Sequence, residues 1–326
     1  EHLKRWMVDR GAEGDRVEAC HINVDPSIWA PDSGEQARVR EELAIPADAT
    51  VLLYPARLCA QKQPRVFAEA VRRVVEAGGG AGGSADGAAA PAAKVVALVV
   101  GDGEDRPWLE SFIRKHNLGE SIRFLGAKPP EAMPSLYRAA DVLFLPSRWE
   151  GIALSIYEAM AAGLCVVGAD VGGQRELVTP ETGVLLDVSA EPEDVQDERY
   201  AAALRELVGD APRRAAMGAA GRERIAQHFT LDVMGQRMLG LFEKARTLRD
   251  RAPRQILPRR LAEELAVRAI DYFRLQRACE RAVKAAGEAA PATPTPAMNA
   301  NGRAQRGGAG ATPKANRRKP ARSRKN

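Results

Sequence analysis

Short runs of apolar residues recur along the first two thirds of the chain. They lie at Ala49–Leu58, Ala93–Glu104, Ser121–Gly126, Asp141–Ser147, Leu164–Asp170 and Gly183–Val188. Such runs, bounded by Gly, Pro or polar residues, predict β-strands. The run at Ala93–Glu104 is almost continuously β-branched and ends in Gly, which is typical of a strand buried on both faces.

Segments with helical spacing of apolar residues separate these strands. They lie at Pro64–Ala77, Pro107–His116, Pro130–Ala140 and Ala153–Ala162. Strands that alternate with helices of roughly 10–15 residues predict an α/β fold, a doubly wound parallel sheet with helices on both faces. Sheets of this kind bind ligands at the carboxyl ends of their strands. The loops to search are therefore Pro55–Lys62, Gly101–Asp105, Ser147–Ser155 and Ala169–Gly173.

The pattern changes after Val188, where only helical spacing remains. Helices are predicted at roughly 191–209, 211–228, 231–249 and 256–284. Two stretches cannot pack a core: the Gly- and Ala-rich segment 78–93, which we expect to be a surface loop, and the tail from about residue 287. We therefore predict a main domain at 33–250, a helical extension at 251–286 and a disordered basic tail at 287–326.

The charge is unevenly distributed. The net charge is +5, yet residues 289–326 hold nine Lys and Arg and no acid, so the rest of the chain carries about −4. The negative net charge of the globular part gives no reason to expect that it binds nucleic acid. The basic tail suits an anionic surface, a partner or solubility. Because the chain begins at Glu1 without a leader and has no apolar run of about 18 residues, we expect a fragment of a longer cytoplasmic protein, with membrane association left open.

The cysteines and histidines indicate neither a disulfide framework nor a metal site. The four cysteines are widely spaced without a C-x-x-C pair, and no two histidines stand four residues apart. No D-x-D triplet, phosphate-binding P-loop or G-x-S-x-G motif occurs either. We therefore predict no metal and no resident cofactor, in a reducing compartment.

The segment Ser147–Gly163 combines a loop with an unusual helix. A strand ends at Pro146, and a helix begins near Ala153, so its first free amides point to the binding edge. Free amides at a helix start bind anions. Glu158 follows one turn later among Ile, Ala and Met, where a carboxylate is costly unless it accepts hydrogen bonds. It would accept them from ribose hydroxyls, or it is a solvated helix residue.

Two cations and a glycine turn lie at the same predicted edge. Arg57 and Lys62 share one loop and would neutralise a diphosphate, or they are solvated loop cations. Gly101–Gly103 forms a tight turn after a strand. This turn is not a dinucleotide fingerprint, because Arg106 stands where its last glycine would be.

Four sequence blocks together resemble the retaining glycosyltransferases of family 4. They are A-R-L-C-A-Q-K-Q-P, V-G-D-G-E, E-G-I-A-L-S-I-Y-E-A-M-A-A-G-L-C-V-V and V-G-G-Q-R-E-L-V, in the order of that family. The resemblance covers about residues 15–245 and is to the C-terminal, nucleotide-sugar-binding half of the two-domain GT-B fold. His21–Pro31 resembles the segment that links the two halves, so residues 1–32 are expected to be this linker and a remnant of the N-terminal half.

The resemblance implies a role for each matching residue. Glu158 matches the glutamate that holds the ribose, Glu150 the glutamate beside the donor sugar, and Arg57 with Lys62 the pair that grips the diphosphate. The residues that match the amide-lined loop and helix start are Gly151, Ile152, Ala153, Leu154 and Ser155, and those that match a turn near the base are Gly101, Asp102 and Gly103.

Some positions depart from the family pattern or have a simpler explanation. Cys165 stands where proline is common, and Ala153 where glycine is frequent. Gly172, Gly173 and Glu176 also match a family block, but we expect them to form a structural turn.

The resemblance implies a glycosyltransferase that moves a sugar from a nucleotide-diphospho-sugar, such as a UDP- or GDP-sugar, with retention of anomeric configuration. The acceptor would be a saccharide, a lipid or a small molecule, and a missing N-terminal Rossmann-like half would be the structural partner. A phosphorylase, synthase or epimerase of the same fold is one alternative. A non-catalytic nucleotide-sugar-binding or scaffold module is the other.

Overall fold

The computed structural model describes residues 1–79 and 94–251. The predicted helix at 256–284, the basic tail and most of the segment 78–93 lie outside the described residues. The strands are β1 (Thr50–Pro55), β2 (Val95–Val100), β3 (Ile122–Gly126), β4 (Val142–Leu145), β5 (Cys165–Ala169) and β6 (Gly183–Leu186). The helices between and after them are α4 (Pro64–Gly79), α5 (Arg106–Lys115), η1 (Pro130–Ala132), α6 (Met133–Ala139), α7 (Leu154–Ala161), α8 (Gln174–Leu177), α9 (Glu193–Gly209), α10 (Ala211–His228) and α11 (Leu231–Arg251).

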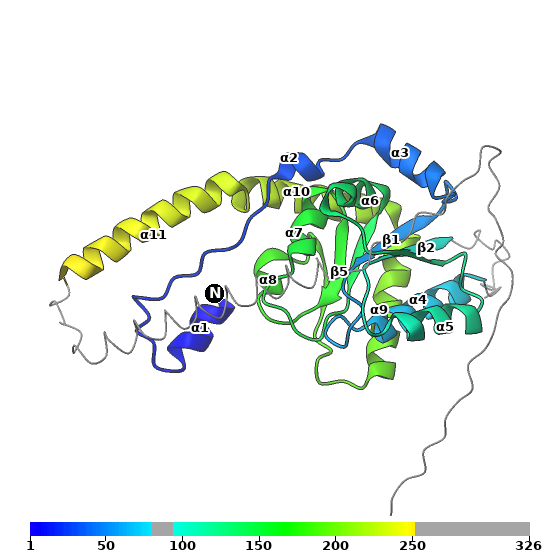
Figure 1. Ribbon diagram of the computed structural model, residues 1–326, viewed down its shortest axis with the longest axis horizontal. Coiled ribbons are helices and arrows are strands. Elements are labelled where there is room, and N and C mark those ends of the chain that lie inside the picture. The colour runs from blue at the N-terminus through cyan, green and yellow to red at the C-terminus, as the bar shows by residue number, and fades with distance from the viewer. Residues whose placement is uncertain (80–93, 252–326) are drawn as a thin grey trace, which may run out of the picture. The chain divides into compact units, whose positions relative to one another are not determined.

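The six strands form one parallel sheet in the order β3-β2-β1-β4-β5-β6 (Figure 1). The strands β1 and β2 pair in register from Thr50 opposite Val95 to Pro55 opposite Val100. Every residue of β2 is buried, because helices cover both faces of the sheet. The predicted doubly wound parallel sheet is confirmed.

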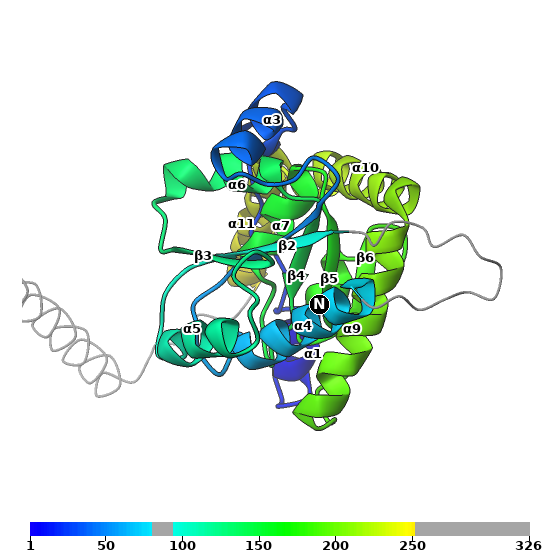
Figure 2. The same cartoon turned by 90° about the vertical axis from the view of Figure 1, so that its right-hand side faces the viewer.

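Helices form a layer on each face of the sheet (Figure 2). The helices α4, α5 and α9 cover one face, and α6, α7 and α10 cover the other. Aromatic side chains fill the first interface: the rings of Tyr54 and Phe67 stack with centroids 4.3 Å apart, and Phe144 packs against Phe67 at 5.4 Å. Burial of such large apolar side chains is the main stabilising contribution to a fold of this kind.

Three helices near the N-terminus do not follow from the apolar pattern. They are α1 (His2–Val8), α2 (Pro26–Trp29) and α3 (Ser33–Glu42). The helix α3 is mostly polar and buries only Val39, so its spacing gives no amphipathic signal. Its start is set by Asp32, whose side chain accepts a hydrogen bond from the amide of Glu35.

The helices of the described part include none that is long and apolar enough to cross a membrane. Among the described residues, Cys20, Cys59 and Cys165 are free thiols. Burial raises the pKa of the Cys165 thiol to about 12, which makes it unreactive at neutral pH.

Candidate functional site

The strand order reverses between β1 and β4, and a cavity of about 460 Å³ lies at the carboxyl end of the sheet there. This place follows from topology, because the loops after β1 and β4 leave the sheet in opposite directions. Nine of the twelve predicted site residues line the cavity: Arg57, Lys62, Gly101, Glu150, Ile152, Ala153, Leu154, Ser155 and Glu158.

Lys62 and Glu150 form an ion pair within this cavity. The ammonium of Lys62 donates a hydrogen bond to Oε1 of Glu150, whose side chain is only 8% exposed. The loop of Lys62 is anchored by the hydroxyl of Tyr54, which donates to the Lys62 carbonyl at 2.7 Å. Arg57 and Lys128 are exposed, and neither side chain has a partner anywhere in residues 1–79 and 94–251. The cavity therefore offers two free cations, Arg57 and Lys128, and a third, Lys62, that is neutralised by an acid.

Glu158 lies on α7 and has a tyrosine partner. The hydroxyl of Tyr137 donates a 2.6 Å hydrogen bond to its Oε2. Burial raises the pKa of Glu158, and the Tyr137 hydrogen bond opposes that increase. Burial and the nearby Glu158 hold the pKa of Tyr137 well above its usual value. The pair therefore consists of a protonated phenol and a partly desolvated carboxylate.

The start of α7 presents open backbone amides to the cavity. Ala153 is its N-cap and offers no side-chain hydrogen bond, so the amides of the first turn have no side-chain partner. Leu154 and Ser155, the first two residues of the helix, line the cavity. An uncapped helix start of this kind favours a bound anion.

The glycine turn after β2 shapes the loop that carries Arg57. A Cβ at Gly101 would stand 2.0 Å from the carbonyl oxygen of Ala56, and one at Gly103 would stand 2.3 Å from that of Leu58. Only glycine permits this close approach. Asp102 and Gly103 lie outside the lining of the cavity, and the Asp102 carbonyl accepts a hydrogen bond from the amide of Leu58 at 2.9 Å.

Gly151 also lies outside this cavity and lines an adjoining one of about 500 Å³. The amide of Gly173 donates to the Gly151 carbonyl at 2.7 Å. Gly172 has a φ of +61°, and a Cβ there would meet the Glu150 carbonyl oxygen at 1.9 Å. The Gly172–Gly173 turn therefore fixes the backbone that carries Glu150.

Other residues of the lining were not among the predicted site residues. They include Lys128, Met133 and Tyr137. Lys128 follows β3 at the carboxyl edge of the sheet, so the same strand-end rule could have found it. Tyr137 sits in the middle of a helix with no local signal, and only the folded chain brings it to Glu158.

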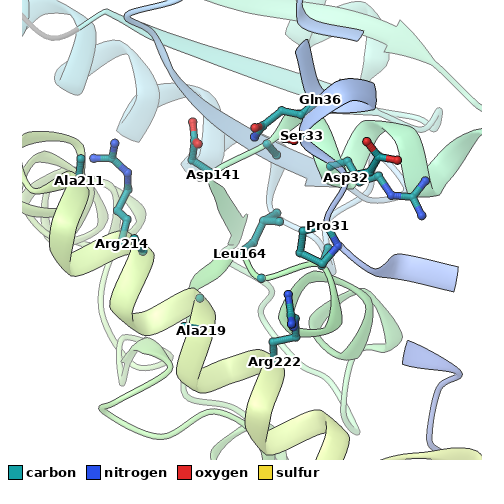
Figure 3. Close-up of a pocket in the computed structure, with 16 residues that line it drawn as sticks. Pro31, Asp32, Ser33, Gln36, Asp141, Leu164, Ala211, Arg214, Ala219 and Arg222 are labelled. Atoms are coloured by element: carbon teal, nitrogen blue, oxygen red, sulfur yellow. The ribbon is translucent and has the colours of Figure 1, made fainter. Parts of the chain in front are cut away.

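A second cavity of about 460 Å³ lies at the opposite, amino edge of the sheet (Figure 3). Arg214 and Arg222 reach it from α10, and α3 with the loop before it forms the other side. Most of its charges are already paired: Asp141 binds Arg40 at 2.8 Å, and Arg214 donates to backbone carbonyls at the end of α9. This cavity has little unpaired charge to offer a ligand.

No group of three or more His, Cys, Asp or Glu that could hold a metal ion occurs in the part of the chain that the structure describes.

Residues 35–224 match the family model of the glycosyl transferases group 1, and the chain belongs to this family. Among curated proteins, a D-inositol 3-phosphate glycosyltransferase of Thermomonospora curvata is 35% identical over 270 residues, which are 79% of this chain and 58% of that protein. A GDP-mannose-dependent monoacylated alpha-(1-6)-phosphatidylinositol monomannoside mannosyltransferase of Corynebacterium glutamicum is 29% identical over 230 residues, 68% of this chain and 54% of that protein. The chain spans about half the length of the curated relatives it matches.

Solved structures share the fold. HepE of Anabaena, solved with UDP and glucose, is 21% identical with a TM-score of 0.59, over 74% of this chain and 60% of that one. The C-terminal domain of a group 1 family glycosyl transferase from Francisella tularensis is 23% identical with a TM-score of 0.52. That match covers 64% of this chain and 99% of the domain. These likenesses confirm a Rossmann-like fold of the type found in glycosyltransferases.

Proposed function

We propose that this chain is the donor-binding, C-terminal half of a retaining glycosyltransferase of family 4 with the GT-B fold, and that it binds a nucleotide-diphospho-sugar. One observation carries the proposal. The cavity where the strand order reverses holds two carboxylates, two free cations, a paired cation and an open helix start. The match to an entire C-terminal domain of another group 1 family member supports the assignment to that half.

In this proposal the nucleotide enters with its diphosphate between Arg57 and the start of α7. Arg57 is free to bind at once, and the amides near Leu154 add a second set of donors. Charge-assisted hydrogen bonds contribute roughly 1.5–3 kcal/mol each. The ribose lies toward Glu158, whose carboxylate accepts from its hydroxyls.

The Lys62–Glu150 pair supplies a change that accompanies donor binding. A diphosphate offers Lys62 more negative charge than one carboxylate, so the ammonium turns to the phosphate and leaves Glu150. Glu150 is then available beside the sugar ring. As the bond between sugar and phosphate breaks, Arg57 and Lys62 stabilise the charge that develops on the leaving phosphate.

We propose that the reaction needs no metal cofactor and that the protein acts in the cytoplasm. The positive charge that a diphosphate needs comes from Arg57, Lys62 and the start of α7. We also propose that an upstream Rossmann-like half provides the contacts to the acceptor. The match covers only 58% and 54% of relatives that are named for inositol 3-phosphate and for a phosphatidylinositol monomannoside.

Calorimetric titration of the chain with UDP and with GDP tests the proposal. At least one should bind, with or without EDTA, and Glu158→Ala should weaken that binding by about 1.5–3 kcal/mol, the usual contribution of a hydrogen bond to a charged group. Glu120→Ala, an exposed acid outside the cavity, is the matched control and should bind as the wild type does. Failure of both nucleotides to bind, or equal affinity of Glu158→Ala, contradicts the assignment.

A further inference from the structure

Tyr137, on α6, contacts Glu158 from a fully buried position. Its side chain is 0% exposed, and its hydroxyl donates the 2.6 Å hydrogen bond to Oε2 of Glu158. Trp29 packs edge-on against its ring, with centroids 5.1 Å apart and planes at 76°. Since close packing fixes side-chain rotamers, the hydroxyl has little freedom to leave the carboxylate.

The hydrogen bond occupies only one oxygen of the carboxylate. The other oxygen, Oε1, has no hydrogen-bond partner among the residues that the structure describes, and Glu158 lines the cavity. An ionised carboxylate accepts through both oxygens. One oxygen is thus held by the protein, and the other is left for a ligand.

The direction of the hydrogen bond decides which form of Glu158 it favours. Burial holds the pKa of Tyr137 well above its usual value, so the phenol keeps its proton and must be the donor. A donor to a carboxylate favours the ionised form, which opposes the effect of burial on the pKa of Glu158. Tyr137 therefore maintains Glu158 as a hydrogen-bond acceptor despite its apolar surroundings.

We propose that Tyr137 is a positioning residue for ribose recognition: it orients Glu158 so that Oε1 accepts hydrogen bonds from the vicinal 2′ and 3′ hydroxyls of the nucleotide. This proposal rests on the proposed function, because it needs a nucleotide in the cavity. Tyr137 acts through Glu158. Its effect should therefore depend on the ribose hydroxyls and on pH, which a purely structural contribution to the fold would not.

Other charged groups face Glu158 from the neighbouring loops. They are Arg57 and Lys62 after β1, Lys128 after β3 and Glu150 after β4. All four are retained in the variants below. A pH profile that changes between those variants therefore reports the Tyr137–Glu158 pair.

The test compares Tyr137→Phe with the wild-type chain in titrations with UDP and GDP and with their 2′,3′-dideoxy counterparts, from pH 5.5 to 8.5. Tyr137→Phe should weaken binding of the ribonucleotide about tenfold at the acid end of this range, the loss expected for one hydrogen bond to a charged group. The deficit should shrink as the pH rises and Glu158 ionises without help. Binding of the dideoxy nucleotide should be the same in both proteins.

Tyr200→Phe is the matched control. Tyr200 is also fully buried, its hydroxyl has no hydrogen-bond partner in the described chain, and it does not line the cavity. It should leave affinity and pH profile unchanged. In a double-mutant cycle, adding Tyr137→Phe to Glu158→Gln should cost little further affinity, because both changes remove the same contact.

Distinct outcomes separate the two proposals. If neither UDP nor GDP binds the wild type, the proposed function fails and this inference fails with it. If a nucleotide binds and Tyr137→Phe keeps the wild-type affinity, ribose preference and pH profile, only the inference is overturned.

A measurement on the wild-type chain covers the case in which Tyr137→Phe does not fold. With ¹³C labels, the Cδ resonance of Glu158 and the Cζ resonance of Tyr137 should titrate together with pH, and both should shift when UDP or GDP binds. Titration of Glu158 without a response at Tyr137 would contradict the proposal.

Discussion

At the scale of single residues, Arg57 and Lys62, the two cations of the loop after β1, differ in their interactions in the free protein. Lys62 neutralises a largely buried acid, whereas the side chain of Arg57 is exposed and has no partner in the described residues. Removing one member of a buried pair leaves the other desolvated and unpaired, which is more costly than losing an exposed charge. Substitution of either residue should therefore weaken nucleotide binding, but only substitution of Lys62 should lower the stability of the fold markedly.

We predict that Lys62→Ala lowers the free energy of unfolding by about 1–3 kcal/mol, because Glu150 is left buried without its partner. Arg57→Ala should change it by less than about 0.5 kcal/mol. Urea denaturation of the two variants provides the comparison. Both should bind UDP or GDP more weakly. Adding Glu150→Gln to Lys62→Ala should recover most of the stability, and no recovery would argue against an unpaired charge as the cause.

Glu158 should make the free protein less stable. Burial raises its pKa in the folded chain above the unfolded value, so the folded state holds its proton more tightly. The free energy of unfolding then decreases as the pH rises from the unfolded pKa to the folded one, and the full cost is present above the folded pKa. We predict that Glu158→Gln has a higher Tm than the wild type at pH 7 and that this difference disappears in acid. Thermal denaturation at both pH values checks it, and an equal or lower Tm at pH 7 would contradict the prediction.

Among single residues, the sequence predicts which charged residues belong to the site better than it predicts their hydrogen-bond partners. Glu150, Arg57 and Lys62 stand out because they follow strands at the binding edge of the sheet, and Glu158 because it lies among apolar residues of a helix. Tyr137 does not, because a tyrosine inside a helix is ordinary until a residue 21 positions later in the sequence folds against it.

At the scale of elements, the turn after β2 controls the loop after β1. The amide of Leu58 donates to Asp102, and the Leu58 carbonyl accepts from the amide of Asp105 at 3.0 Å. The close approach to Leu58 that these bonds require is possible only without a side chain at Gly103, and the approach of Gly101 to Ala56 has the same requirement. The position of Arg57 is therefore set by a neighbouring element.

We predict that Gly101→Ala lowers the free energy of unfolding by about 2–4 kcal/mol, because its Cβ would meet backbone that cannot give way and its φ of +146° strains any other residue. Nucleotide affinity should fall as well, since the Arg57 loop must move. Gly119→Ala, where nothing lies within 4 Å, is the control and should be nearly neutral. Denaturation and calorimetry measure the two effects, and a Gly101→Ala variant as stable as the control would refute the packing argument.

Elements with strong apolar spacing were predictable, and those without it were not. All six strands and the helices α4 to α7 and α9 to α11 follow from runs or spacing of apolar residues. The helix α3 escapes because only Val39 is buried, and α2 because it has four residues. Their boundaries depend on Asp25 and Asp32 as caps and on packing against α6 and α7.

At the scale of the whole molecule, the described sheet forms one side of the cleft that the proposed reaction requires. The chain spans about half the length of the curated relatives it matches. A reactive sugar donor also needs a surface that excludes water and holds the acceptor. In our proposal an upstream half provides both.

We predict that the 326-residue chain binds UDP or GDP but transfers sugar to an acceptor poorly. Joining it to an upstream Rossmann-like half should increase transfer by at least about tenfold, through closure of the cleft. Radiolabelled UDP- and GDP-sugars with the two proteins give the comparison. Equal turnover of one acceptor by the short and the long protein would refute the half-enzyme proposal.

The position of the connection between α4 and β2 determines how freely its length can vary among related proteins. The helix α4 ends at Gly79, and β2 begins at Val95 at the amino edge of the sheet, so both points lie away from the cavity at the carboxyl edge. Doubling the length of a loop costs only about 0.6 kcal/mol. Related proteins can therefore gain or lose residues between positions 79 and 94 without selection acting through the donor site. The same position should accept a fluorescent reporter whose signal follows folding and leaves nucleotide affinity unchanged.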